Sequence, residues 1–254
     1  MGRILGAALL ALCLLTTSHP ATVVAQDAPI EITYGDAVNG DITDDEFEVN
    51  YIFSGNEDDI VMIEMLRASS LIDPKLQLKS AVGDVLFEND DFLYPSAVII
   101  TSLRSDGEYT ITATRYNGRD GESEGNYLLR LSLVEPTEFG TTIDTQIFPS
   151  NDIDETTLPQ LVVLYPENEV TVSVNMEMGE GEAFAALHLV TPDTEAFGSY
   201  ASLVEFNPGV PIYNLSFDIE LQDEQIYVIY ATRAFASYAF DAEPLDVSIT
   251  VEEA

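Results

Sequence analysis

The chain contains two copies of one pattern. The segment YTITATR at 109–115 returns as YVIYATR at 227–233, with five of seven positions identical and an offset of 118 residues. Three further apolar blocks recur in the same order, starting at Val61 and Val172, at Leu76 and Leu187, and at Leu129 and Val247. Blocks that recur in one order with small changes of offset indicate a tandem duplication of one β domain.

The first 25 residues have the pattern of a secretory signal peptide. Arg3 precedes an apolar run at 4–15, and small residues follow up to Ala25. That run has 12 residues, whereas a bilayer-spanning helix needs about 20. We therefore expect cleavage after Ala25, a secreted mature chain in the extracellular space or the periplasm, and no membrane insertion. The single cysteine, Cys13, leaves with the signal, so we expect no disulfide.

The chain is strongly acidic, with 45 Asp and Glu against 9 Lys and Arg and a net charge of −36. Such a surface repels nucleic acids and anionic membranes, which excludes both as partners. The apolar residues are nevertheless frequent and periodic, so the chain is not a disordered acidic tail. The acids lie in clusters between the apolar blocks. One interpretation is that these acids keep the protein soluble or adapt it to a salty habitat. The other is that some of these loops bind calcium.

The apolar residues alternate along short segments, which is typical of antiparallel sheets with one buried and one wet face. The first copy has apolar residues at 61, 63 and 65, and the second copy places Thr171, Ser173 and Asn175 on the opposite face. Strands are predicted at 29–33, 48–53, 60–66, 75–79, 84–87, 96–102, 108–115 and 126–134. Turn formers such as Asn39-Gly40 and Gly83-Asp84 separate them.

These patterns predict an all-β chain with two tandem antiparallel β-sandwich domains of jelly-roll type after the signal peptide. We expect the signal peptide at 1–25, the first sandwich at 26–135 and the second at 136–254. The junction falls near Glu135-Pro136, where the last strand of the first copy ends. The linker is short, so we expect the two sandwiches to touch.

The first copy resembles the bacterial pre-peptidase C-terminal (PPC) domain family over nearly all of 32–134. The matching motifs are Gly-x-x-Val-x-Gly at 35–40, Tyr51-Ile-Phe53, Asp73-Pro74-x-Leu76-x-Leu78, Asn89-Asp90-Asp91 and Asp106-Gly107-x-Tyr109. The second copy is more divergent, with Asn207-Pro208-Gly209 in place of Asn89-Asp90-Asp91. The resemblance implies a non-catalytic module that accompanies secreted hydrolases. It also implies a relation to the calcium-binding β-sandwich modules that bind collagen in bacterial collagenases.

The chain offers little catalytic chemistry. The expected mature chain has one histidine, His188, which the alternation places on a solvent-facing side, and it has no cysteine. It lacks a Gly-x-Ser-x-Gly elbow and a Gly-rich phosphate loop with lysine. We therefore expect no enzyme activity, although a glycosidase with a pair of carboxylates stays open because acids are so numerous.

The sequence suggests one metal site. Glu88, Asn89, Asp90 and Asp91 follow one another directly, and Asp73 or Asp106 could complete the coordination shell. Calcium takes six to eight oxygen ligands from such side chains. The alternative is an ordinary solvated turn.

Arg115 and Arg233 occupy equivalent strand ends in the two copies. We expect each of them to form a structural ion pair with a loop acid, with contact to an anion as the alternative.

Three functions are compatible with the sequence. The first is a secreted binding or accessory module that attaches to an extracellular polymer or to a protein partner, with or without calcium. The second is a structural protein of the cell surface or matrix. The third is a secreted hydrolase that acts through carboxylates. We favour the first, because sandwich folds without a marked catalytic constellation are usually binding modules.

Overall fold

The computed structural model describes residues 28–68, 71–90, 96–147, 160–178, 185–190, 201–203, 214–233 and 244–254. The expected signal peptide lies outside these residues. The regular structure within them is β-strand, apart from one 3-10 turn at Gly118–Asp120. Within the described ranges, no helix has the length and apolar character that a membrane span requires.

The first sandwich consists of two sheets. One has the order β1-β3-β8-β5-β6 and the other the order β2-β9-β4-β7. The strands are β1 (Ile30–Glu31), β2 (Ala37–Ile42), β3 (Glu48–Gly55), β4 (Ile60–Arg67), β5 (Pro74–Ser80), β6 (Val85–Asn89), β7 (Ala97–Ser102), β8 (Gly107–Arg115) and β9 (Gly125–Leu133). All neighbouring strands pair antiparallel except the two-residue β1, which pairs parallel with β3.

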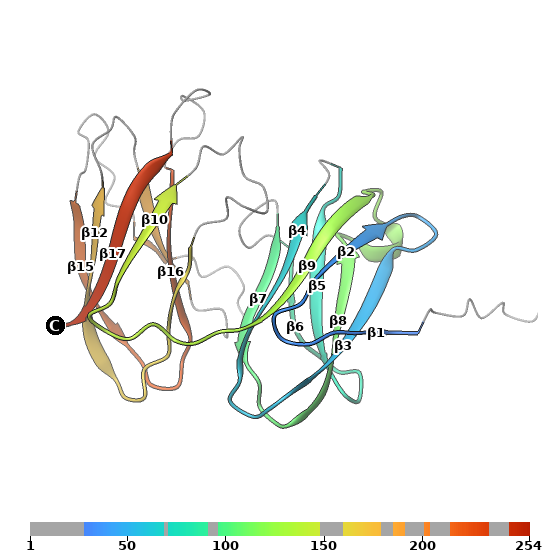
Figure 1. Cartoon of the computed structure of the whole chain (residues 1–254), viewed down its shortest axis with the longest axis horizontal. Helices are drawn as coiled ribbons and strands as arrows, with labels where there is room; N and C mark the ends of the chain where they lie inside the picture. The colour runs from blue at the N-terminus through green and yellow to red at the C-terminus, as the bar shows by residue number, and fades with distance from the viewer. Residues whose placement is uncertain are drawn as a thin grey trace, which may run out of the picture.

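The second sandwich repeats this topology. Its sheets have the orders β10-β17-β12-β15 and β11-β16-β13-β14, which reproduce the first sandwich when eight is added to each strand number from β2 to β9. The strands are β10 (Thr142–Ile147), β11 (Val162–Leu164), β12 (Val170–Met178), β13 (Ala185–Val190), β14 (Ala201–Leu203), β15 (Asn214–Leu221), β16 (Tyr227–Arg233) and β17 (Leu245–Glu253). Figure 1 shows the two sandwiches side by side. The expected fold class of two jelly-roll-like sandwiches is confirmed.

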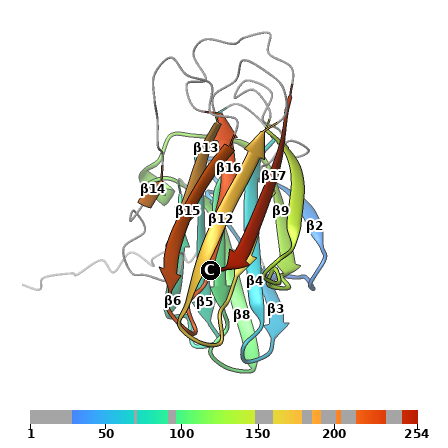
Figure 2. The same ribbon diagram turned by 90° about the vertical axis from the view of Figure 1, so that its left-hand side faces the viewer.

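Each sandwich encloses its own apolar core. In the first, the inward residues of β4 and β9 meet those of β3, β5 and β8, among them Ile63, Leu131 and Ile111. In the second, Val174, Val251 and Ile229 take the corresponding places. Figure 2 looks onto β15, β12 and β17 of the second sandwich. The alternation in the sequence identified these inward faces, because successive side chains of a strand point to opposite sides.

The last strand of the second copy is placed differently from the sequence alignment. In the sequence, the recurring apolar blocks make Leu129 equivalent to Val247, at an offset of 118 residues. In the first sandwich Met65 lies opposite Leu129, and in the second the equivalent Met176 lies opposite Ile249. The structural offset is therefore 120. A shift of two residues keeps every side chain on its original face, so the apolar pattern alone does not reveal it.

One strand of the first copy was missed in the sequence. Asn39-Gly40 is not a turn but lies inside β2, where Gly40 is paired with Tyr127. The ring of Tyr127 occupies the space that a Cβ atom at Gly40 would need. The glycine is thus required by close packing of an aromatic ring and not by a turn conformation.

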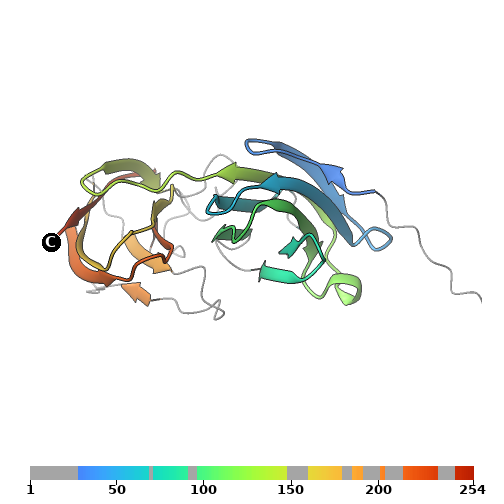
Figure 3. The same cartoon turned by 90° about the horizontal axis from the view of Figure 1, so that it is seen from below.

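The two sandwiches share a third apolar cluster. The outer face of sheet β2-β9-β4-β7 contributes Ile60, Val98 and Ile100, and the outer face of the sheet containing β11 and β16 contributes Val163, Val228 and Tyr230. The molecule is therefore a stack of four sheets, seen from below in Figure 3. The expectation of a wet outer face is wrong for β4 and β7, because the second sandwich covers it.

Candidate functional site

The predicted calcium ligands Glu88 and Asn89 lie in β6, and as neighbours in a strand they point to opposite sides. The carboxylate of Glu88 forms an ion pair with Lys75 at 3.2 Å and accepts a hydrogen bond from Gln77 Nε2 at 3.2 Å. Partial burial tends to raise the pKa of Glu88, but the contacts with Lys75 and Gln77 outweigh burial and hold its pKa below the ordinary value. The negative charge of Glu88 is thus already balanced by the charge of Lys75.

Asn89 connects the two sheets of the first sandwich. Its Oδ1 accepts a hydrogen bond from the backbone N–H of Val98 at 3.0 Å, and the side chain is buried. This bond joins β6 to β7, which are the outermost strands of their sheets. Asp90 follows β6 and is half-buried, whereas Asp91 lies outside the described residues.

The two auxiliary acids lie at opposite ends of the sheet. Asp73 precedes β5 at the end where β6 finishes, and its backbone N–H donates to Ser123 Oγ at 3.1 Å. Asp106 lies at the other end, where its Oδ1 accepts from the N–H of Glu57 at 2.8 Å. Within the described ranges, no three His, Cys, Asp or Glu residues gather in an arrangement that could hold a metal ion. Calcium binding stays a prediction.

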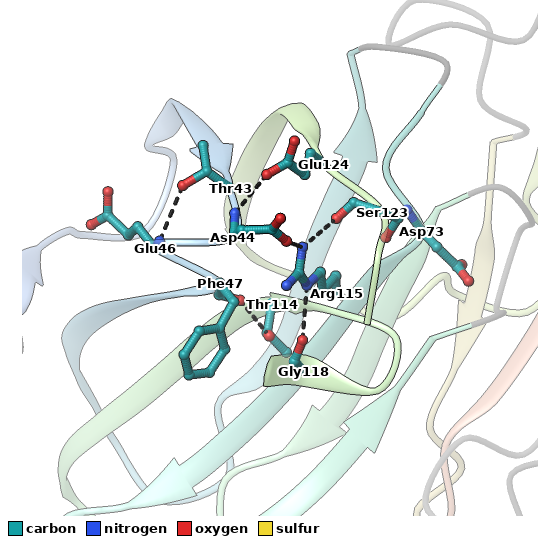
Figure 4. Close-up of polar contacts among 10 residues, drawn as sticks. All are labelled: Thr43, Asp44, Glu46, Phe47, Asp73, Thr114, Arg115, Gly118, Ser123 and Glu124. Carbon is teal, nitrogen blue, oxygen red and sulfur yellow. Dashed lines mark hydrogen bonds and ion pairs between the residues drawn. The ribbon is translucent and has the colours of Figure 1, made fainter. Parts of the chain in front are cut away.

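Arg115 forms the expected structural ion pair, at the end of β8. Its side chain is 1% exposed. The guanidinium donates to Asp44 Oδ1 at 2.9 Å, to the carbonyl of Ser123 at 3.1 Å and to the carbonyl of Gly118 at 2.8 Å (Figure 4). Asn117 has a φ of 59°, and this left-handed turn directs the chain back toward the arginine. Arg115 therefore holds two loops together as a structural residue. The side chain of Arg233 lies outside the description.

An apolar cleft of about 520 Å³ opens at one edge of the first sandwich. It lies between the β5–β6 hairpin and the loop from β7 to β8. Four inward-pointing residues, Leu78, Phe87, Leu103 and Tyr109, line it, and Ser80, Val82, Val85 and Leu86 line it on the hairpin side. Arg104, Asp106 and Glu108 line the opposite rim. A hollow with an apolar lining and a few polar groups is the usual form of a ligand site.

The hairpin next to the cleft exposes an unusual amount of apolar surface. Val82 is 84%, Val85 49% and Leu86 42% exposed. The pairing of β5 and β6 is irregular here, because Leu78 pairs with Phe87 while Lys79 pairs with Val85, which leaves Leu86 as the extra residue of a β-bulge. Bulges bend a strand and redirect its side chains, and they are frequent beside functional sites. The bulge thus presents Val85 and Leu86 together at the rim.

The outer face of the sheet that contains β6 is polar and satisfied within itself. Thr112 Oγ1 donates to Asn50 Oδ1 at 2.6 Å, and Gln77 bonds to Glu88. Among the described residues with large exposed apolar side chains, Tyr116 is the one aromatic, so this part of the chain carries no row of exposed rings. The cleft, and not a flat sheet face, is the candidate binding site.

The cleft was not predicted from the sequence. One sequence feature could have indicated it. Val82, Val85 and Leu86 surround the turn former Gly83-Asp84, a position where polar residues are usual. His188, considered in the sequence for catalysis, lies in β13, whose side chains are outside the description.

No protein-family model matches the chain, and no curated protein sequence matches it. Among solved structures, the chain is similar to the pre-peptidase C-terminal domain of a collagenase from Bacillus anthracis, with a TM-score of 0.36, 13% identity and coverage of 41% of this chain and 95% of that one.

It is also similar to the tandem CBM22-1–CBM22-2 domain of Xyn10C from Paenibacillus barcinonensis (TM-score 0.26, 13% identity, 87% and 92% coverage). A putative secreted protein from Eubacterium rectale follows (TM-score 0.27, 10% identity, 86% and 74% coverage). The PPC resemblance thus stays a resemblance, and the assignment of the fold rests on the strand order of the chain itself.

Proposed function

We propose that the chain is a secreted, non-catalytic binding protein, and that the apolar cleft of the first sandwich is its contact site for an extracellular polymer or protein. The observation that carries this proposal is the exposure of Val82, Val85 and Leu86 beside a cleft of about 520 Å³. The net charge of −36 is sufficient to keep the protein soluble, and exposed apolar side chains do not contribute to solubility. Apolar residues that gather at the rim of a hollow therefore favour a role in recognition.

The second sandwich has a supporting role in this proposal. It covers an outer face of the first sandwich through the cluster that includes Ile100 and Val228, and that face is consequently closed to ligands. The cleft is lined by residues of the first sandwich and stays open. A structural protein of the cell surface or matrix is the alternative, because the paired sandwiches also suit a rigid building unit.

We also propose that calcium, if it binds, acts at the end of β6 near Asp90 and Asp73, where it would offset repulsion between acids. Calcium sites of extracellular modules have dissociation constants of about 10⁻⁴–10⁻³ M, so a millimolar concentration contributes about 1 kcal/mol of stability. EDTA should then lower the melting temperature by a few degrees. An Asp90→Ala variant should lose that dependence, whereas an Asp120→Ala variant, exposed in another loop, should keep it. A melting curve that EDTA leaves unchanged would contradict calcium binding.

Co-sedimentation tests the proposed function. Purified 26–254 is mixed with insoluble collagen, chitin, cellulose and peptidoglycan, in calcium and in EDTA. Leu86→Asp places a charge at the cleft, and Ile30→Asp places the same charge at a residue of similar exposure (46%) outside it. We expect retention on one support, loss of retention for Leu86→Asp and no change for Ile30→Asp. Retention that Leu86→Asp leaves intact would remove the cleft as the site, and retention on no support would favour the structural role.

A further inference from the structure

We infer that the ligand of the cleft is an extended polypeptide segment, with apolar side chains at alternate positions and basic residues between them, that adds to β6 as a further strand. This inference rests on the proposed function, because it takes the cleft as the binding site and specifies what occupies it. Three observations carry it: the position of β6 in its sheet, the orientation of the cleft lining and the charge of the rim.

The first observation is that β6 is the last strand of the sheet β1-β3-β8-β5-β6. It pairs with β5 on one side, and the order of the described strands places no strand on the other. The outer N–H and C=O groups of an edge strand are a template for a further strand. At its far end, the hydrogen bond from the Val98 N–H to Asn89 Oδ1 closes β6 against β7. The available stretch is therefore 85–88, with the bulge at Leu86 inside it. Peptides often bind proteins by adding a strand at such an edge.

The second observation is the floor of the cleft. Phe87 points inward from β6 and lies with Leu78, Leu103 and Tyr109 in the lining, whereas Val85 and Leu86 remain exposed at the rim. A strand placed beside β6 directs every second side chain to the same side as Phe87. Apolar side chains at alternate positions would thus enter the cleft, and the intervening side chains would face solvent.

The third observation is charge. Asp106 and Glu108 line the cleft, and Asp84 lies in the turn of the hairpin. Among the described residues that line the cleft, Arg104 is the single cation. The chain as a whole carries −36. Because opposite charges at a rim favour encounter and like charges oppose it, the intervening positions of the partner should be Lys or Arg. An acidic segment of the same apolar pattern would be rejected.

The test uses purified 26–254 and synthetic nonapeptides at 150 mM salt, where long-range attraction is screened beyond about 8 Å. The parent peptide alternates valine with lysine or threonine, and a set of variants replaces valine by leucine, isoleucine, phenylalanine or tyrosine. Controls group the apolar residues together or replace lysine by glutamate. Two further peptides carry N-methyl groups on the odd or on the even amides. Affinities are measured by fluorescence anisotropy for wild type, Leu86→Asp and Ile30→Asp.

We expect Leu86→Asp to weaken binding of the alternating basic peptides at least tenfold and Ile30→Asp to change it less than twofold. One N-methylated series should lose at least tenfold and the other less than twofold, since a strand added at one edge uses alternate amides. Bound peptide should also slow hydrogen exchange of amides within 85–88.

Equal binding of both methylated series would overturn strand addition and leave the cleft as a site for side chains. If no peptide of the set binds in a manner that depends on Leu86, the inference is overturned. In that case the co-sedimentation experiment still decides whether the cleft binds another polymer, so the two failures can be told apart.

Discussion

Replacement of Arg115 by methionine should destabilise the first sandwich by about 3 kcal/mol. Methionine keeps an apolar stem in the buried site but removes the three guanidinium donors, which reach Asp44, Gly118 and Ser123 at 2.8–3.1 Å. The two carbonyl bonds are worth about 1 kcal/mol each. The ion pair adds about 1 kcal/mol at most, because the Asp44 side chain is 76% exposed and water screens it.

Thermal unfolding measures this effect. For a chain of this size 1 kcal/mol corresponds to a shift of about 2–4 °C, so Arg115→Met should lower the melting temperature by about 6–12 °C. Arg104→Met removes the same charge from an exposed position and should change stability by less than about 0.5 kcal/mol. Asp44→Asn retains both carbonyl bonds and should cost about 1 kcal/mol or less.

Two results would contradict this role of Arg115. If Arg115→Met has the same melting temperature as Arg104→Met, Arg115 does not hold the two loops together. If Asp44→Asn costs as much as Arg115→Met, the ion pair and not the carbonyl bonds provides the stabilisation.

Three further variants test the packing of the strands. Gly40→Ala introduces a Cβ where the ring of Tyr127 lies, so it should cost about 1–3 kcal/mol in chemical denaturation, and an unchanged midpoint would contradict that packing. Burial raises the pKa of Glu64 above its ordinary value of 4.5, and the positive charge of Arg130 opposes this shift. The folded state therefore favours the protonated form of Glu64. The stability of the fold consequently falls as the pH rises from about 4.5 through the pKa of the folded state. Glu64→Gln has no such loss, so its free energy of unfolding relative to wild type should be higher at pH 7 than at pH 4. A difference in stability that does not depend on pH would contradict a buried acid at this position. Ile100→Asp places an unpaired charge in the cluster between the sandwiches and should cost about 3–5 kcal/mol and expose 135–141 to a Glu-specific protease; the wild-type melting and cleavage pattern would contradict that interface.

The faces of the strands could be predicted because their cause is local. Val61, Ile63 and Met65 alternate with the two-residue period of a strand, and all three are buried in the first core. The equivalent positions of the second copy behave in the same way. The ion pair of Arg115 could also be anticipated, since an arginine at a strand end among acidic loops has few other partners.

Other features depended on parts of the chain that are distant in sequence. Gly40 lies in a strand because β2 pairs with β9, and it is a glycine because the ring of Tyr127, 87 residues later, fills the space of a Cβ atom. Glu88 and Asn89 looked like a shared ligand set, but pairing with β5 separates their side chains to opposite sides of β6. The cleft forms where hairpin β5–β6 meets the loop after β7, a contact that no local pattern encodes.

The order and the period of the apolar residues predict the class of fold, the duplication and the inward face of the alternating strands such as β4 and β8. Three features depend on contacts between distant strands: which outer face is buried, the shift of the last strand of the second copy by two residues, and the place where the apolar cleft opens. Apolar residues at every second position show which side chains share a face of a strand. The neighbour that covers that face depends on packing between strands that are distant in the sequence.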